Sequence, residues 1–325
     1  MSAILKAVQS FIEDEIDIYF VAYSGGLDSS ILLLEVQEAL KKSQLKTLKA
    51  IHINHNYSKN SKKWEEHCQN FCSLNGIELL VFDIDVSQIK GASLEDQFRK
   101  KRYEIFNKCL KKGGRLFTGH HEDDNIETLF LRLLRGTGLK GARSIPIKRN
   151  IGNGDVARPF LNFTKSELKI IAEKKSLVYL EDESNKDNTF DRNYIRNLVL
   201  PLIEERWPSY RKNINKFITN ANNSYEMLLD EAKEDINYLT NEDINQIDIK
   251  KLKDFSPERQ KNIIIYWINL LNLNPPNSKV LNEIIEKFLH ASKAAEPKLI
   301  WGAKNKKGSV CLRIKKGYLE ASPLS

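Results

Sequence analysis

The sequence predicts an α/β protein: a doubly wound, mostly parallel sheet followed by a smaller, mainly helical domain with short terminal strands. Three observations support this fold class. Apolar blocks alternate with blocks of helical period through the first 140 residues, a glycine-rich turn joins one strand to the next helix, and the composition changes near residue 207. A chain of 325 residues also exceeds the usual size of a single core, so we expect two domains, 1–207 and 208–325.

Four strands are expected in the first domain. Each is rich in β-branched or aromatic residues and is bounded by turn or polar residues. They cover 16–23, 45–54, 77–85 and 114–120, and the helices expected between them cover 31–43, 62–76 and 93–114. Strands and helices in this order form an open parallel sheet with helices on both faces, and ligands bind such sheets beyond the carboxyl ends of the strands.

The second domain is expected to be helical up to a basic tail. A helical pattern covers 210–239, and two further amphipathic stretches cover 256–274 and 277–291. The tail is typical of short strands and has no acidic residue from Lys298 to Lys316. Because it also carries Trp301 and Tyr318, it offers both phosphate neutralisation and stacking surfaces, and we expect this domain to contact nucleic acid. The alternative is a solvated basic surface.

Composition narrows the class of protein further. Hydrophobic residues make up 41% and charged residues 29% of the chain, and no apolar run approaches the roughly 18 residues of a membrane-spanning helix. The N-terminus lacks the basic region of a secretory signal, so we expect a cytoplasmic protein. The four cysteines match neither a disulfide framework nor a zinc site and are interpreted as buried free thiols. The net charge of +8 favours polyanionic partners.

The stretch SGGLDSS, residues 24–30, forms the turn between the first predicted strand and its helix. Glycines 25 and 26 allow a tight turn that brings backbone N–H groups close to a ligand, and the hydroxyls of Ser24, Ser29 and Ser30 add donors at a helix N-terminus. Such a turn suits an anion such as pyrophosphate. It lacks the Gly-Lys-Ser/Thr end of a Walker A loop, and an acid at position 28 is expected if Mg²⁺ lies between it and the phosphates. Alternatively, Asp28 is a helix cap.

This turn resembles the SGGxDS fingerprint of the PP-loop ATP pyrophosphatases, which split ATP into AMP and pyrophosphate to adenylate an oxygen. The resemblance implies that Ser24, Gly25, Gly26, Leu27, Asp28 and Ser29 bind ATP. Two later stretches narrow the family. TGHHEDDNIETLFLRLLRGTG, 118–138, and EDESNKDNTFDRNYIRNLVLP, 181–201, resemble motifs of the tRNA(Ile)-lysidine synthetases, in the same order and spacing.

Membership of that family implies a ligase that forms a carbon–nitrogen bond. The cytosine O2 of cytidine 34, in the CAU anticodon of an isoleucine tRNA, attacks the α-phosphate of ATP. The ε-amine of free lysine then displaces AMP from C2 to give lysidine. Many members carry one further C-terminal domain that this sequence lacks, and the oligomeric state stays open, with a homodimer as one option.

The resemblance and the residue chemistry together give the candidate catalytic residues. Mg²⁺ held by Asp28 and Asp124 would neutralise charge on the phosphate. Asp124 and Glu127 lie three residues apart on one helix face, where they can bind the ammonium groups of lysine or, for one of them, the metal. Arg192 and Arg196 lie one helical turn apart, so both can cover the active site or contact the anticodon backbone.

Three further points stay open at this stage. Arg102 can bind a phosphate or the lysine carboxylate. A lysine amine with a pKa of about 10.4 is deprotonated in roughly one molecule per thousand near neutrality, yet neither His120 nor His121 can be assigned as the base. A PP-loop cytidine thiolase and a non-catalytic nucleotide- or RNA-binding module remain alternatives, although a thiolase needs paired cysteines and the four here form no CxxC pair.

Overall fold

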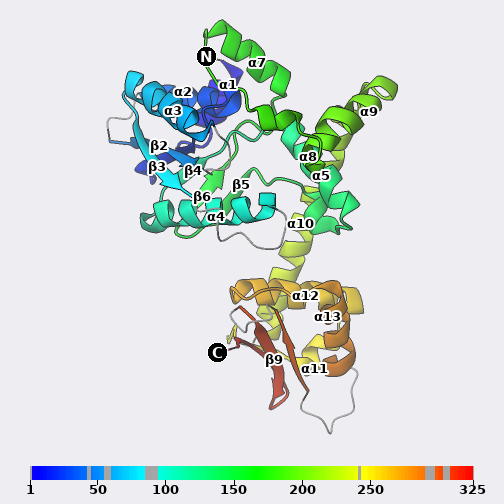
Figure 1. Ribbon diagram of the computed structural model, residues 1–325. Coiled ribbons are helices and arrows are strands. Elements are labelled where there is room, and N and C mark those ends of the chain that lie inside the picture. Colours follow the sequence, from blue (N-terminus) through cyan, green and yellow to red (C-terminus); the bar gives the residue numbers. More distant parts are fainter. Residues whose placement is uncertain are drawn as a thin grey trace. The chain divides into compact units, whose positions relative to one another are not determined.

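The computed structural model describes residues 2–41, 45–54, 60–84, 94–240, 243–289, 297–302 and 308–324. It divides into two compact units, Met1–Ile218 and Thr219–Ser325. The division falls inside one helix, α10 (Tyr210–Leu239), which matches the helix predicted over 210–239 (Figure 1). The domain boundary predicted at residue 207 stays a prediction, but the first compact unit also takes in the first turns of α10.

The first unit is built on a six-stranded sheet in the order β3-β2-β1-β4-β6-β5. The strands are β1 (Ile18–Ala22), β2 (Thr47–Asn54), β3 (Glu78–Asp83), β4 (Arg115–Phe117), β5 (Lys148–Ile151) and β6 (Gly154–Ala157). All neighbours pair in parallel except β5 with β6, which form an antiparallel hairpin at one edge. The predicted mostly parallel sheet is therefore confirmed.

Helices cover both faces of this sheet, as Figure 1 shows. Tyr19 and Val21 of β1 share a core with α1 (Ala3–Gln9), α2 (Leu27–Leu40), α3 (Ser61–Leu74) and α7 (Lys165–Lys174). Phe20, which points the other way because side chains alternate along a strand, packs in a second core with Phe106 of α4 (Leu94–Cys109). The doubly wound arrangement follows from this alternation.

A helical cluster completes the first unit. It contains α5 (Glu122–Leu134), α6 (Leu139–Ala142), α8 (Asp191–Tyr194), a π-helix (Ile195–Val199), α9 (Leu200–Arg206) and the start of α10. Ile126, Ile195, Leu200 and Tyr210 form its buried centre. This packing holds the segment 191–206 against α5, so two stretches far apart in sequence meet beside the carboxyl edge of the sheet.

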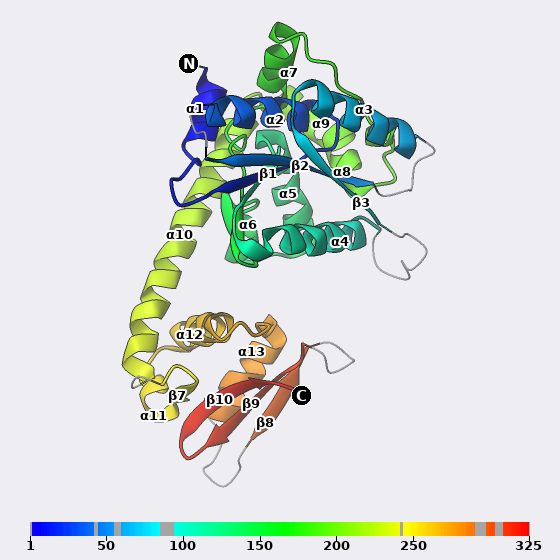
Figure 2. The same cartoon turned by 90° about the vertical axis from the view of Figure 1, so that its left-hand side faces the viewer.

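The second unit combines helices with a four-stranded antiparallel sheet in the order β7-β10-β9-β8 (Figure 2). Its strands are β7 (Gln246–Asp248), β8 (Lys298–Trp301), β9 (Val310–Lys315) and β10 (Tyr318–Pro323). Its helices, besides the end of α10, are α11 (Ile249–Leu252), α12 (Pro257–Leu270) and α13 (Ser278–Ile284), which continues as a π-helix (Ile285–Leu289). Trp267 of α12 and Leu312 of β9 are fully buried in one core. The predicted helices and terminal strands are confirmed.

Two further expectations are answered by the structure. All four cysteines are free, and three of them are buried. Within the described residues, no helix is both long and apolar enough to cross a membrane.

Candidate functional site

The turn between β1 and α2 lies at the carboxyl edge of the sheet. Gly25 adopts a φ of +81°, and a Cβ built on it would lie 3.0 Å from the Sγ of Cys68, so both the backbone conformation and the space require glycine here. The carbonyl of Gly25 accepts a hydrogen bond from the backbone N–H of Leu180. The residue just before the motif at 181–201 therefore packs directly on this loop.

The serine hydroxyls of the turn hold the turn together. Ser29 Oγ and Ser30 Oγ donate to the carbonyl of Gly26 over 3.0 and 2.9 Å, and Ser24 Oγ lies 3.1 Å from Ser29 Oγ. Ser30 is fully buried and its hydroxyl donates within the loop, so its expected contact with a ligand stays a prediction. Ser24 is exposed at the edge of the turn.

Asp28 follows the turn, in the first turn of α2. The N-cap residue of this helix is Gly26, so the alternative interpretation of Asp28 as a cap is wrong. Its Oδ1 is buried without a hydrogen-bond partner in the described part of the chain, and burial raises the pKa of this carboxyl. Gly119 approaches so closely that a Cβ there would lie 3.2–3.3 Å from atoms of Asp28. A half-buried carboxylate with an unused oxygen thus faces the loop that follows β4.

The acids at the start of α5 divide into two roles. Asp123 accepts a hydrogen bond from the backbone N–H of Lys165 over 2.9 Å and forms an ion pair with Arg211, so it ties α5 to α7 and α10. Asp124 instead turns toward Asp28. The Nε2 of His121 lies between these two acids, 3.5 Å from Asp124 Oδ2 and 3.7 Å from Asp28 Oδ2.

Glu127 and the two predicted arginines form one buried network. Arg192 donates from Nε to Glu127 Oε2 and from Nη2 to Asp124 Oδ1, both over 2.8 Å. Arg196 donates from Nε to Glu127 Oε1 over 2.6 Å and from Nη2 to Glu127 Oε2 over 2.8 Å. The predicted shared face of Asp124 and Glu127 is confirmed, because both contact the same arginines. Glu127 is 1% exposed, and both of its oxygens are occupied.

The charges of this network shift the pKa values of the two neighbouring histidines in opposite directions. Burial opposes protonation of His121, but the carboxylates of Asp124, Asp123 and Asp28 outweigh it and raise its pKa. Burial lowers the pKa of His120 to about 3, and nearby arginines add to this effect. The raised pKa favours the protonated form of His121, whereas His120 is a weak base. The base for the lysine amine stays unassigned.

Comparison with known proteins identifies the family. A family model described as a PP-loop domain matches residues 2–203, which is more than half of the chain. The chain belongs to the PP-loop family. A second model, described as a TilS substrate binding domain, matches residues 247–319, inside the second unit.

Curated PP-loop relatives support the narrower resemblance. Proteins named tRNA(Ile)-lysidine synthase from Buchnera aphidicola, Coxiella burnetii and Pseudomonas putida are 38%, 37% and 37% identical over 87%, 86% and 77% of this chain. The resemblance predicted from the three motifs is thereby confirmed. The chain spans 64%, 62% and 60% of the length of these relatives.

A solved structure confirms the PP-loop fold. The U34-tRNA thiolase NcsA from Methanococcus maripaludis, with its [4Fe-4S] cluster, has a TM-score of 0.55 and 17% identity, over 67% of this chain and 76% of that one. At this identity only the fold is shared. Burial raises the pKa of Cys68 to about 12 and that of Cys72 to about 11, so these two thiols of α3 stay protonated and are poor cluster ligands. The thiolase alternative is not favoured.

The remaining predicted residues of this PP-loop protein include Arg102 in the first unit and Trp301 in the second. Arg102 lies half-buried on α4, and its predicted role stays a prediction. Trp301, expected to offer a stacking surface, is 9% exposed in the core of the second unit, and its Nε1 donates to the carbonyl of Asn274 over 2.9 Å. That expectation is wrong. Lys304, Lys306 and Lys307 of the basic tail lie outside the described residues.

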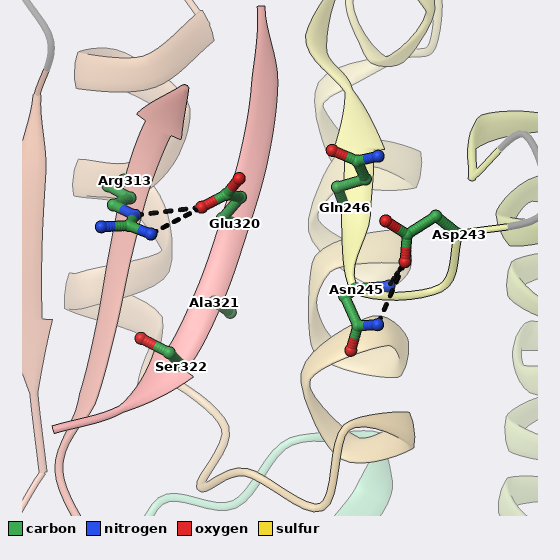
Figure 3. A pocket seen from close by; sticks show the side chains of 7 residues that line it. All are labelled: Asp243, Asn245, Gln246, Arg313, Glu320, Ala321 and Ser322. Carbon is green, nitrogen blue, oxygen red and sulfur yellow. Dashed lines mark hydrogen bonds and ion pairs between the residues drawn. The ribbon is translucent and has the colours of Figure 1, made fainter. Parts of the chain in front are cut away.

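A shallow pocket in the second unit is lined by polar side chains that bind one another (Figure 3). Arg313 donates to Glu320 Oε2 over 2.8 and 3.1 Å, and the backbone and side-chain nitrogens of Asn245 both donate to Asp243 Oδ1 over 3.0 Å. The charged groups of this pocket are thus paired with neighbouring side chains or backbone.

The two histidines of the PP-loop site provide a test of its charge distribution. In a pH titration followed by imidazole ¹⁵N NMR, we expect His120 to stay neutral from pH 8 down to the acid limit of folding, since its pKa lies near 3. His121 is expected to titrate above the ordinary value of about 6.5, because three carboxylates favour its cation. Asp124→Asn should move the His121 titration downward. A His121 that titrates below 6.5 would contradict the described charge network.

Proposed function

We propose that this protein ligates free lysine to C2 of cytidine 34 in an isoleucine tRNA with a CAU anticodon, through an adenylated tRNA intermediate, with release of AMP and pyrophosphate. The observation that carries the proposal is the unused buried oxygen of Asp28 beside the PP-loop, opposite Asp124 and its two arginines. The names of the curated relatives support the choice of substrate. Because tRNA and ATP are its substrates, we place the protein in the cytoplasm.

The acids fit a magnesium ion. Mg²⁺ is usually held by one or two carboxylates together with phosphate oxygens, and Asp28 Oδ1 has no hydrogen bond in the described ranges that a metal would have to replace. The pKa of Asp124 lies well below its usual value, because His121 and the arginines outweigh its burial, so this acid is ionised. When bound there, Mg²⁺ would neutralise charge on the phosphate under attack. We therefore propose Asp28 as the principal ligand and Asp124 as the second.

The arginines supply fixed positive charge at the same place. Arg192 and Arg196 are held in position by Asp124 and Glu127. Positioned guanidinium groups stabilise the charge that develops on a transferring phosphoryl group. Because both oxygens of the buried Glu127 bind guanidinium groups, we propose that it positions the arginines. We propose Asp28, whose Oδ1 has no partner in the described ranges, as the acid that first meets a cationic ligand. Asp124 also accepts hydrogen bonds at both oxygens, from Arg192, Arg196 and the N–H of His121, and would share them with the cation.

The second unit is proposed to contact the tRNA. The matched description of a substrate binding domain supports this role, as does the absence of a catalytic motif there. The basic residues of the acid-free tail, from Lys298 to Lys316, would contact the phosphates of the tRNA.

The decisive experiment is incubation of the whole chain with an unmodified CAU isoleucine tRNA transcript, ATP, Mg²⁺ and isotope-labelled lysine. We expect mass analysis of position 34 to show labelled lysidine, with one pyrophosphate released per lysine incorporated. A transcript with a changed anticodon loop and a reaction without ATP serve as controls. ATP binding without any incorporation of lysine would favour the non-catalytic alternative.

A further inference from the structure

A second group of arginines surrounds Tyr103 of α4. Arg158, which directly follows β6, donates from Nη2 to the Tyr103 hydroxyl over 3.2 Å. The guanidinium carbons of Arg99 on α4 and Arg149 on β5 lie 5.3 and 5.2 Å from the centre of the tyrosine ring. Helix α4 and the β5–β6 hairpin, which lie apart in sequence, thus direct three positive charges at one aromatic side chain.

Among the described residues these three arginines have no carboxylate partner. In the described part of the chain no ion pair joins Arg99, Arg149 or Arg158 to an acid. By contrast, Arg115 binds Asp155, and the arginines of the acid–arginine network bind Asp124 and Glu127. An uncompensated cluster of this kind is costly unless an anion joins it, because like charges repel and a desolvated cation loses its hydration.

Arg158 lies at the bottom of the cluster. It is 2% exposed, its Nη1 donates to the carbonyl of Pro146 over 2.6 Å, and its Nε is buried without a hydrogen-bond partner among the described residues. Arg99 and Arg149 are exposed at the rim. Burial alone would raise the pKa of Tyr103, yet these arginines hold it below its usual value. The local potential is therefore strongly positive, and a buried donor is available.

The cluster lies at the ligand-binding edge of the sheet. β6 pairs in parallel with β4, and the N–H of Thr118 donates to the carbonyl of Ala157, so Arg158 stands beside the loop that leads to His120. In the strand order, β4 separates β6 from β1 and its PP-loop. Two strand spacings amount to about 10 Å. Neighbouring phosphates of one nucleotide lie closer together than this distance. A triphosphate bound on the PP-loop would therefore not reach the arginine cluster, which is then free to bind a different phosphate.

We propose that Arg99, Arg149 and Arg158 bind a backbone phosphate of the RNA next to the nucleotide that enters the site. Guanidinium forks match phosphate oxygens, a buried donor fixes the register, and exposed rim arginines suit a polyanion that arrives from solvent. The identity of the polyanion as RNA rests on the proposed function.

The test measures binding by the whole chain to two separate probes, an RNA hairpin with the CAU anticodon loop and Mg·ATP. In the double variant Arg99→Gln with Arg149→Gln, we expect about tenfold weaker hairpin binding or more, and a plot of log affinity against log salt whose slope is shallower by about one, because the three arginines share one phosphate. The affinity for ATP should stay unchanged. Lys41→Gln is the matched control, because this exposed residue ends α2 at the opposite edge of the sheet and should leave the salt slope unaltered.

The outcomes separate the sources of the phosphate. If ATP binding weakens while hairpin binding does not, the phosphate belongs to the nucleotide and the proposal is wrong. If neither changes, the arginines serve only the fold. Arg158→Lys, which keeps the charge but loses the fork, should weaken hairpin binding without a change of slope. Hairpin binding that depends on these arginines, in a protein that incorporates no lysine, would support this site while rejecting the proposed ligation.

Discussion

Replacement of Asp28 by asparagine is expected to slow formation of the adenylated tRNA by about 1,000-fold, the scale of loss when one preorganised electrostatic group is removed from a transition state. Asparagine keeps the size of the side chain but removes the charge proposed to hold Mg²⁺ against the phosphates. Rapid measurement of pyrophosphate release in the presence of tRNA reports this step directly.

The fold should tolerate this change. Asp28 Oδ1 makes no hydrogen bond in the described part of the chain, and burial already disfavours its ionised form, so the neutral amide should be at least as stable in the folded protein. The matched control is Asp123→Asn, which loosens the contacts of α5 with Lys165 and Arg211. That variant should unfold more easily yet still adenylate. Near wild-type adenylation by Asp28→Asn would exclude the metal role.

The apolar strands of the sheet could be predicted from the sequence, whereas the hairpin at its edge could not. Runs such as 16–23 place β-branched and aromatic residues on both faces, which is typical of a strand covered by helices on both sides. The β5–β6 hairpin escaped prediction because its strands are four residues each and β5 is mostly exposed and polar. Nothing in its periodicity distinguishes it from a loop.

The candidate site was predictable as a set of residues but not as a set of contacts. Motif spacing identified Asp124, Glu127, Arg192 and Arg196, and the structure brings all four together. Their pairing depends on the packing of segment 191–206 against α5, which one sequence does not reveal. The sequence likewise does not show that Asp123 binds Arg211 while Asp124 approaches His121 and Asp28.

Burial decided the one case where residue type misled. Trp301 lies in a basic segment, where an aromatic residue can either stack on a base or fill a core, and the core includes it. No role was predicted for Arg158, and its burial beside Tyr103 shows only in the structure. Neither distinction can be read from local pattern, because both depend on which elements cover the residue.

The link between Glu127 and the arginines carries the second large effect. Glu127→Gln keeps the shape of a 1% exposed side chain but removes the charge that both guanidinium groups bind. Since Arg192 and Arg196 also contact Asp124 and remain partly hydrated, we expect a loss of about 2 kcal/mol of folding stability, less than for a fully isolated buried pair. Glu122→Gln on the same helix is the control. The Glu122 side chain is hydrogen-bonded to Asn215, so its substitution should leave the arginines in place.

A double-mutant cycle then separates positioning from direct binding of lysine. If Glu127 acts through Arg196, then Glu127→Gln and Arg196→Gln should each slow adenylation by about 100-fold, and the double variant should be little slower than either one. The KM for lysine should change less than kcat, because the arginines would act on the phosphoryl group.

If Glu127 instead binds the lysine ammonium, as the motif alone suggests, adenylated tRNA should accumulate in Glu127→Gln. The KM for lysine should then rise, and the two substitutions should multiply. If the two substitutions slow adenylation independently, Glu127 binds lysine. If the double variant is no slower than the single variants, Glu127 acts by holding the arginines in position beside the phosphate.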